Sequence, residues 1–152
     1  MNTQDLQEAL ERAVQDVFET MYFMFPEPIG SQDNMAYAPE SCLEARVNLK
    51  NSPHVMVLQG SDKLAHDMAA GLLGTDRPIQ PDELVDVFKE AANMIAGGLV
   101  TALNLDNRIQ LDVPRVKRLP SCLIPKTVTV FDIDGQWLNA GITESFAETI
   151  GE

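Results

Sequence analysis

Two pairs of β-type segments in this 152-residue chain are joined by turns too short for a crossover connection. In the first pair, residues 42–49 alternate between apolar and polar side chains, and a short Asn-Ser-Pro turn leads into a strand at 54–59. In the second pair, Asp134-Gly135, a dipeptide typical of hairpin turns, joins strands at 127–133 and 136–143. Strands joined this tightly pair antiparallel, which excludes a doubly wound parallel sheet.

Helical periodicity separates these strands from one another. Residues 3–25 and 82–104 each carry apolar side chains at helical spacing, and a shorter helix is expected between Ser61 and Gly74. The segment 26–41 is rich in Pro, Gly and Asn and is predicted to be a loop, and a further strand is expected at 109–113. The order predicts an α+β fold, an antiparallel sheet with helices packed against it, in a single domain over residues 1–152.

Charge and composition narrow the classes of partner. The net charge of −12 repels phosphate backbones and anionic lipids, so no nucleic acid and no membrane is expected as a partner, whereas a protein with a basic face is favoured. Neither a signal peptide nor a membrane-spanning run is recognisable, which predicts a cytoplasmic protein. Cys42 and Cys122 show no Cys-x-x-Cys spacing and are interpreted as small buried hydrophobic residues.

The helix predicted at 82–104 carries an unusual polar face. On a helical wheel with Glu90 at zero, Asp86, Asn93, Gly97 and Thr101 all fall within about 60° of it, away from the apolar stripe. Glycine inside a helix costs about 1 kcal/mol relative to alanine, so its presence requires a reason. A carboxylate and an amide beside bare backbone would let a partner approach closely. A simpler interpretation is that Gly97 permits tight packing while Glu90 and Asn93 are ordinary surface residues.

The chemistry available to this face suits phosphoryl transfer, in which catalysis comes mainly from positioning and electrostatics. The Asn93 amide can donate and accept hydrogen bonds at once, which suits it to holding a water in line with a phosphorus atom. Glu90 lies about 4.5 Å from it along the helix axis and is able to pair with a lysine of a partner. Asp86, Gly97 and Thr101 are expected to contact the partner.

The segment Glu90-Ala-Ala-Asn93-Met-Ile-Ala-Gly97 resembles the signature helix of the CheC/CheX/FliY phosphatases, in which Glu-x-x-Asn-x-x-x-Gly recurs. Other parts are similar to the same family: the strands at 42–49 and 54–59 that lead into a helix, the segment Asp112-Val-Pro-Arg-Val116, and a final hairpin. The resemblance extends over about residues 4–143.

The resemblance implies an activity and a partner. Members of the family remove the phosphate from the response regulator CheY, which supplies the phosphorylated aspartate, the Mg²⁺ and a lysine. By this resemblance Asn93 orients the attacking water and Glu90 contacts the lysine. No cofactor and no metal site is expected in this chain, because the Mg²⁺ belongs to the phosphorylated CheY-like response regulator.

Relatives with a doubled motif raise the question of a second site. Aligning the first helix with the second puts Asp16 and Glu19 opposite Glu90 and Asn93, so a carboxylate replaces the amide. Phe23 stands where the glycine is expected. We therefore predict one site, the CheX pattern, with Asp16 and Glu19 as solvated charges. The neighbouring apolar cluster of Met21, Phe23, Met24 and Phe25 is interpreted as core or as a subunit contact.

Two rival functions use the same fold. A non-enzymatic adaptor would dock a response regulator on the same face without hydrolysis, and a structural component of the flagellar switch is a third possibility. A homodimer is also predicted, because relatives of the CheX type pair and an unmatched strand edge favours association.

Overall fold

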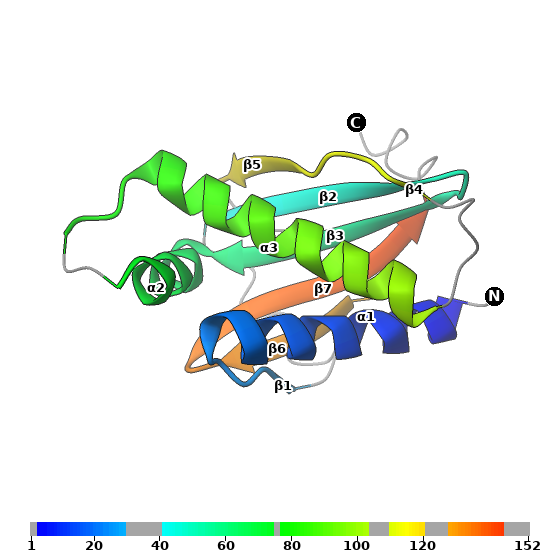
Figure 1. Ribbon diagram of the computed structural model, residues 1–152, viewed down its shortest axis with the longest axis horizontal. Helices are drawn as coiled ribbons and strands as arrows, with labels where there is room; N and C mark the ends of the chain where they lie inside the picture. Colours follow the sequence, from blue (N-terminus) through cyan, green and yellow to red (C-terminus); the bar gives the residue numbers. More distant parts are fainter. Residues whose placement is uncertain (1–2, 30–40, 75–76, 104–109, 121–127, 145–152) are drawn as a thin grey trace.

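The structure, a computed structural model, describes residues 3–29, 41–74, 77–103, 110–120 and 128–144. Within these ranges, no helix combines the length and the apolar character needed to span a bilayer. The described segments form a sheet with its helices gathered over one face (Figure 1).

In the described part of the chain, seven strands make up the sheet, in the order β1-β6-β7-β3-β2-β4, with β5 also paired to β2. All the pairings are antiparallel, which confirms the predicted α+β class. The hairpin turn between β6 and β7 is built as the sequence predicts, since Asp134 and Gly135 both have positive φ, 52° and 85°. The strands are β1 (Glu27–Pro28), β2 (Cys42–Lys50), β3 (His54–Ser61), β4 (Gln110–Leu111), β5 (Arg115–Leu119), β6 (Val128–Ile133) and β7 (Gln136–Glu144).

The described residues form three α-helices, which cover one face of this sheet, and α1 and α3 lie side by side across it (Figure 1). They are α1 (Thr3–Val17), α2 (Asp62–Leu73) and α3 (Pro81–Ala102). Ser61 caps α2 by accepting a hydrogen bond from the Leu64 backbone N–H, and Gly74 ends it in the left-handed conformation, as predicted. The predicted end of α3 at residue 104 lies outside the described residues.

The first helix ends earlier than predicted and in a different form. After Val17 the chain passes into a π-helix, η1 (Phe18–Tyr22), and Phe23 then takes the left-handed conformation with φ 55°. The prediction of a helix to residue 25 is therefore wrong by three residues. The apolar periodicity continues through Phe25, but the Met24 backbone N–H bonds back to the Phe18 carbonyl and the helical path ends there.

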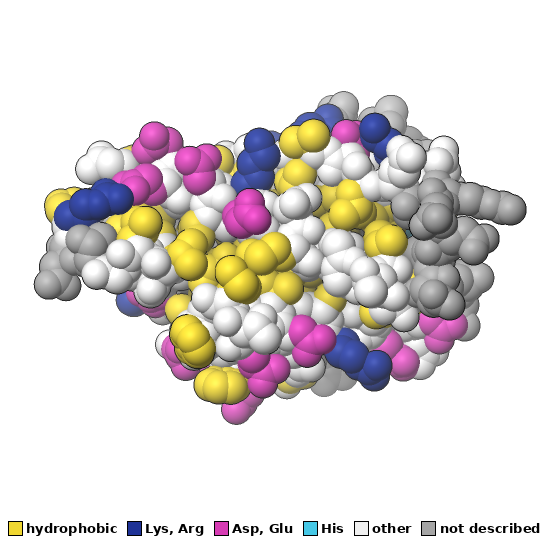
Figure 2. All heavy atoms as spheres, in the orientation of Figure 1, with side chains coloured by type: hydrophobic (Ala, Val, Ile, Leu, Met, Phe, Trp, Pro, Cys, Tyr) yellow, Lys and Arg dark blue, Asp and Glu magenta, His cyan; other side chains and the backbone are white. Residues whose placement is uncertain are grey.

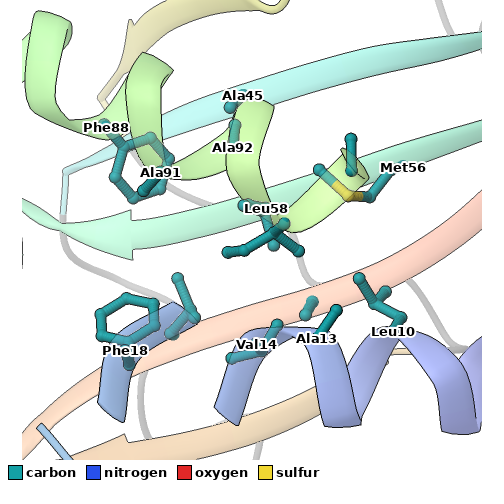
Figure 3. Packing of buried hydrophobic residues seen from close by; sticks show 14 of the residues in the cluster. Leu10, Ala13, Val14, Phe18, Ala45, Met56, Leu58, Phe88, Ala91 and Ala92 are labelled. Atoms are coloured by element: carbon teal, nitrogen blue, oxygen red, sulfur yellow. The ribbon is translucent and has the colours of Figure 1, made fainter. Parts of the chain in front are cut away.

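The core lies between the helices and the sheet. Leu10, Val14 and Phe18 from the first helical segment meet Phe88 and Ala91 from α3 above the strands (Figure 3). This packing buries one side of α3 against α1 and the sheet and leaves its opposite side exposed. By contrast, Met21, Phe23 and Phe25 have exposed fractions of 40%, 82% and 65%, so these three are not core residues, whereas Met24 packs against the core. The alternative that the cluster is a subunit contact stays a prediction.

Two short strands and one disulfide were not predicted. β1 forms within the segment expected to be a loop, and β5 forms after the expected strand at 109–113, of which only Gln110–Leu111 is a strand. Cys42 is disulfide-bonded, which corrects its interpretation as a free buried residue. Cys122, the only other cysteine of the sequence, lies outside the described residues.

Candidate functional site

The start of α3 is firmly defined. Pro81 occupies the first helical position, where its missing N–H costs nothing. The Glu83 carboxylate accepts a 2.9 Å hydrogen bond from the Gln80 backbone N–H and forms a 2.6 Å ion pair with Arg77. The hydrogen bond from Arg77, helped by that N–H, lowers the pKa of Glu83 to about 2. The helix that carries the predicted site residues therefore begins from an anchored first turn.

The two sides of α3 differ as the wheel predicts. Val87, Phe88, Ala91, Ile95 and Leu99 are among its buried residues. Asp86, Glu90, Asn93 and Thr101 are exposed on the other side, and Gly97 is half-buried among them. Because the apolar stripe fixes the rotation of the helix, the polar residues have to face outward.

Three of these residues meet in one cavity. It has a volume of about 500 Å³ and is lined from α3 by Asp86, Lys89, Glu90 and Asn93. Gly97 and Thr101 are not among its lining residues, and Thr101 lies about 12 Å beyond Asn93 along the helix axis. The structure thus brings together Asp86, Glu90 and Asn93, and it leaves Gly97 and Thr101 as further points on the same exposed face.

The opposite wall of the cavity comes from the end of β4 and the segment that leads to β5, and its residues are Leu111, Asp112, Val113 and Pro114. Pairing of both strands with β2 holds this wall against α3. The Asp112 backbone N–H donates to the Asn48 carbonyl at 3.0 Å, and its carboxylate accepts from the Val113 N–H at 2.8 Å. That second bond lowers the pKa of Asp112, so its carboxylate stays charged.

The cavity is therefore predominantly acidic. Its lining holds three carboxylates, Asp86, Glu90 and Asp112, and one cation, Lys89. The Asn93 amide lies among them as a neutral group that donates and accepts hydrogen bonds. An amide cannot serve as a general base, so its contribution to a reaction is to orient a water or a substrate oxygen. The carboxylates suit contact with a basic side chain.

Gly97 differs from Gly98 in its surroundings. A Cβ built on Gly97 meets no atom within 4 Å, whereas one on Gly98 lies 3.5 Å from the Ala13 Cβ of α1. The interpretation that Gly97 permits tight packing therefore does not hold, because Gly98 is the residue that faces another helix. Gly97 leaves the backbone of α3 bare one turn beyond Asn93.

Tyr22, at the end of η1, lies close enough to Glu90 to feel its charge. Its side chain is buried, and its hydroxyl has no hydrogen-bond partner among the described residues. Burial, followed by the nearby charge of Glu90, raises the pKa of Tyr22 to about 12. The hydroxyl is therefore protonated at neutral pH and lies within electrostatic reach of the Glu90 carboxylate. Sequence reasoning missed this residue, because its approach depends on the π-helix.

The first helix does not reproduce the arrangement of α3. Asp16 and Glu19 are exposed, but the change from α-helix to π-helix falls between them. The wider π turn alters the relative directions of side chains three residues apart. The prediction that they are solvated charges agrees with their exposure.

Sequence reasoning also missed Lys89 and the whole second wall. The segment 112–116 resembles the family in sequence, but the sequence does not predict that it lies opposite α3. A proline following Asp112 and Val113 was the available signal for a wall rather than a strand.

The family model described as chemotaxis phosphatase CheX matches residues 44–130. No curated protein matches the chain.

Solved structures share the fold at low sequence identity. The chemotaxis protein CheX from Vibrio vulnificus is 15% identical with a TM-score of 0.71, and the match covers 94% of this chain and 100% of that one. CheX in a CheX–CheY–BeF3–Mg²⁺ complex from Borrelia burgdorferi is 14% identical with a TM-score of 0.62, covering 90% and 97%. The FliM middle domain from Vibrio alginolyticus is 13% identical with a TM-score of 0.59, covering 95% of each chain. At such identities these likenesses show the fold alone, which CheX proteins share with the FliM middle domain.

Proposed function

The chain belongs to the CheX family of chemotaxis phosphatases, and from this premise we propose that it hydrolyses the aspartyl-phosphate of a CheY-like response regulator. The observation that carries the proposal is the cavity in which Asn93 and Glu90 stand together on the exposed side of α3. The family model covers this part of the chain, so family and geometry bear on the same residues.

Asn93 holds the attacking water in the proposed reaction. Its amide oxygen accepts a hydrogen bond from the water and its NH₂ group donates to a phosphoryl oxygen. The water oxygen forms a bond to phosphorus as the bond to the aspartyl oxygen of the regulator breaks, and the water proton passes to a phosphate oxygen. Asn93 therefore acts by position, which is the main route to catalysis in phosphoryl transfer.

Glu90 fixes the geometry of docking by pairing with a lysine of the regulator. An exposed ion pair contributes only about 0–1 kcal/mol, but a pair desolvated at an interface contributes more. Asp86, Gly97 and Thr101 extend the contact along α3, with Gly97 admitting the partner close to the helix backbone. The Mg²⁺ comes with the regulator, and the predicted homodimer and cytoplasmic location remain predictions.

The decisive experiment follows phosphate loss from the CheY-like regulators of the same organism. The wild type is compared with Asn93→Ala and with Asn93→Asp, which keeps the size of the side chain but removes the NH₂ donor. We expect both variants to slow the stimulated rate by about 10²-fold or more, which corresponds to about 2.7 kcal/mol. Binding of the regulator is measured in parallel and should survive in Asn93→Ala.

The rival adaptor role predicts another pattern. An adaptor would bind a regulator without changing its rate of phosphate loss, and Asn93→Ala would then alter affinity alone. A wild type that accelerates decay of none of these regulators would refute the catalytic role.

A further inference from the structure

Several exposed hydrophobic side chains lie on segments close to the site helix. The described residues include six large hydrophobic side chains that are exposed, and they come from the end of η1 and the residues after it, from the end of α2, and from the wall opposite α3. We call this set the apolar collar, and it consists of Met21, Phe23, Phe25, Leu72, Leu73 and Val113. Scattered exposed hydrophobic residues are ordinary. Leu72, Leu73 and Val113, however, line two cavities that share Asp86 and Glu90, which indicates an interaction surface.

Two members of the collar, Leu72 and Leu73, line a groove that shares residues with the acidic cavity. The groove lies between α2 and α3, with a volume of about 270 Å³. Its apolar lining comes from Ala69, Leu72, Leu73 and Val87. Asp86 and Glu90 line both this groove and the acidic cavity. A single partner is therefore able to fill the groove and reach Glu90 at once.

The surface view shows the same arrangement. Hydrophobic side chains cover the region between α2 and α3 and the end of α1, and acidic side chains stand along α3 beside them (Figure 2). Basic side chains are absent from the described residues that line the groove. Glu83 is already paired with Arg77, whereas no ion pair within the described part of the chain engages Asp86 or Glu90.

Phe23 is the most exposed member of the apolar collar, and it also ends η1. Its side chain is 82% exposed and its φ is 55°, a left-handed conformation that costs a non-glycine residue roughly 1–2 kcal/mol. Folding gains little from a large aromatic ring held in water at such a position. The backbone conformation is accounted for by the end of the helix, so it is the exposure of the ring that favours contact with a partner.

We propose that the apolar collar and the groove between α2 and α3 are the docking surface for the response regulator, and that they receive an apolar segment of it flanked by lysine or arginine. This inference rests on the proposed function and concerns affinity rather than chemistry. The apolar contacts supply most of the binding energy, as buried aromatic and aliphatic anchors do at other interfaces. The unpaired carboxylates Asp86 and Glu90 select the basic flank and set its register.

The test separates docking from catalysis. Leu72→Ser with Leu73→Ser changes two half-exposed groove residues, and Lys63→Ser with His66→Ser is a matched control at exposed positions of the same helix outside the groove. The probe is each CheY-like regulator of the same organism, loaded with beryllofluoride and Mg²⁺. Dissociation constants are measured, together with KM and kcat for the phosphorylated regulator.

We expect the groove variant to raise Kd and KM at least tenfold while kcat holds, and the control to match the wild type. Asn93→Ala should show the reverse, with kcat lost and Kd kept. Unchanged Kd and KM in the groove variant would overturn the docking surface, even if Asn93→Ala confirmed the phosphatase. A wild type that neither binds nor accelerates would instead refute the proposed function.

Two further measurements test whether the groove variant changes the oligomeric state or fails to fold. Sedimentation shows whether the groove variant changes the oligomeric state. A change there without a change in Kd would assign the surface to a second copy of this chain and overturn the proposal. If thermal unfolding shows that the groove variant is not folded, Phe23→Ser replaces it, since that side chain is largely in water.

Discussion

Replacing Gly97 by alanine should make the protein more stable and less active. A Cβ at Gly97 meets no atom within 4 Å, so the added methyl group brings no clash within the chain. The gain is then the difference in helix propensity, about 1 kcal/mol. For a chain of this length that raises the melting temperature by about 2–4 °C. At the proposed interface the same methyl group lies where the partner approaches the helix, and overpacking there costs about 1–3 kcal/mol.

The effect on activity is therefore opposite to the effect on stability. A cost of 1–3 kcal/mol weakens binding of the regulator by roughly 5- to 150-fold. Gly97→Leu should lose more binding than Gly97→Ala, since its side chain projects further. Thermal unfolding measures the first effect, and the KM for phosphate loss from the regulator measures the second.

Gly98→Ala is the matched control. Its Cβ would lie in ordinary contact with Ala13, at 3.5 Å, so the variant should gain similar stability. Because it faces α1, its KM should equal that of the wild type. If Gly97→Ala and Gly97→Leu both kept the wild-type KM, bare backbone at this position would have no part in docking. A loss of stability in Gly97→Ala would refute the account of its surroundings.

Two pH effects follow from shifted pKa values. The folded-state pKa of Tyr22, about 12, lies above its ordinary value of 10.0. The contribution of the protonated hydroxyl to the free energy of unfolding is therefore complete below pH 10 and is lost as the pH rises toward 12. Urea unfolding should show a decline of at most about 2.7 kcal/mol over that window, and Tyr22→Phe should remove this part of it. The pKa of Glu83 is lowered from 4.5 to about 2. The contribution of its carboxylate to the free energy of unfolding is therefore present above pH 4.5 and is lost as the pH falls through 2. Arg77→Gln should remove that acid-dependent part of stability in unfolding titrations, and a titration identical to the wild type would contradict the ion pair's role.

The sequence by itself determined the parts of the fold that depend on neighbouring residues. The Ser61 cap, the Gly74 end of α2 and the turn at Asp134-Gly135 all follow from local backbone chemistry. The polar side of α3 is local too, because a 3.6-residue period places Asp86, Glu90 and Asn93 together whenever the helix forms.

Only the tertiary structure decided what these residues face. The second wall of the cavity, with Asp112 and Val113, comes from a segment about 20 residues further along the chain, placed there by pairing with β2. The wheel puts Gly97 on the polar side but does not reveal that its surroundings are open while Gly98 meets α1.

The dependence on long-range contacts also explains why β1, β5 and the π-helix were not predicted from the sequence. β1 has two residues and β5 five, and strands that short carry too few positions to show a period. They form because β6 and β2 offer free edges to them. The π-helix that brings Tyr22 toward Glu90 has no periodicity signal of its own in five residues. Local pattern therefore fixed which side of α3 is polar, whereas long-range pairing and packing made that side a cavity.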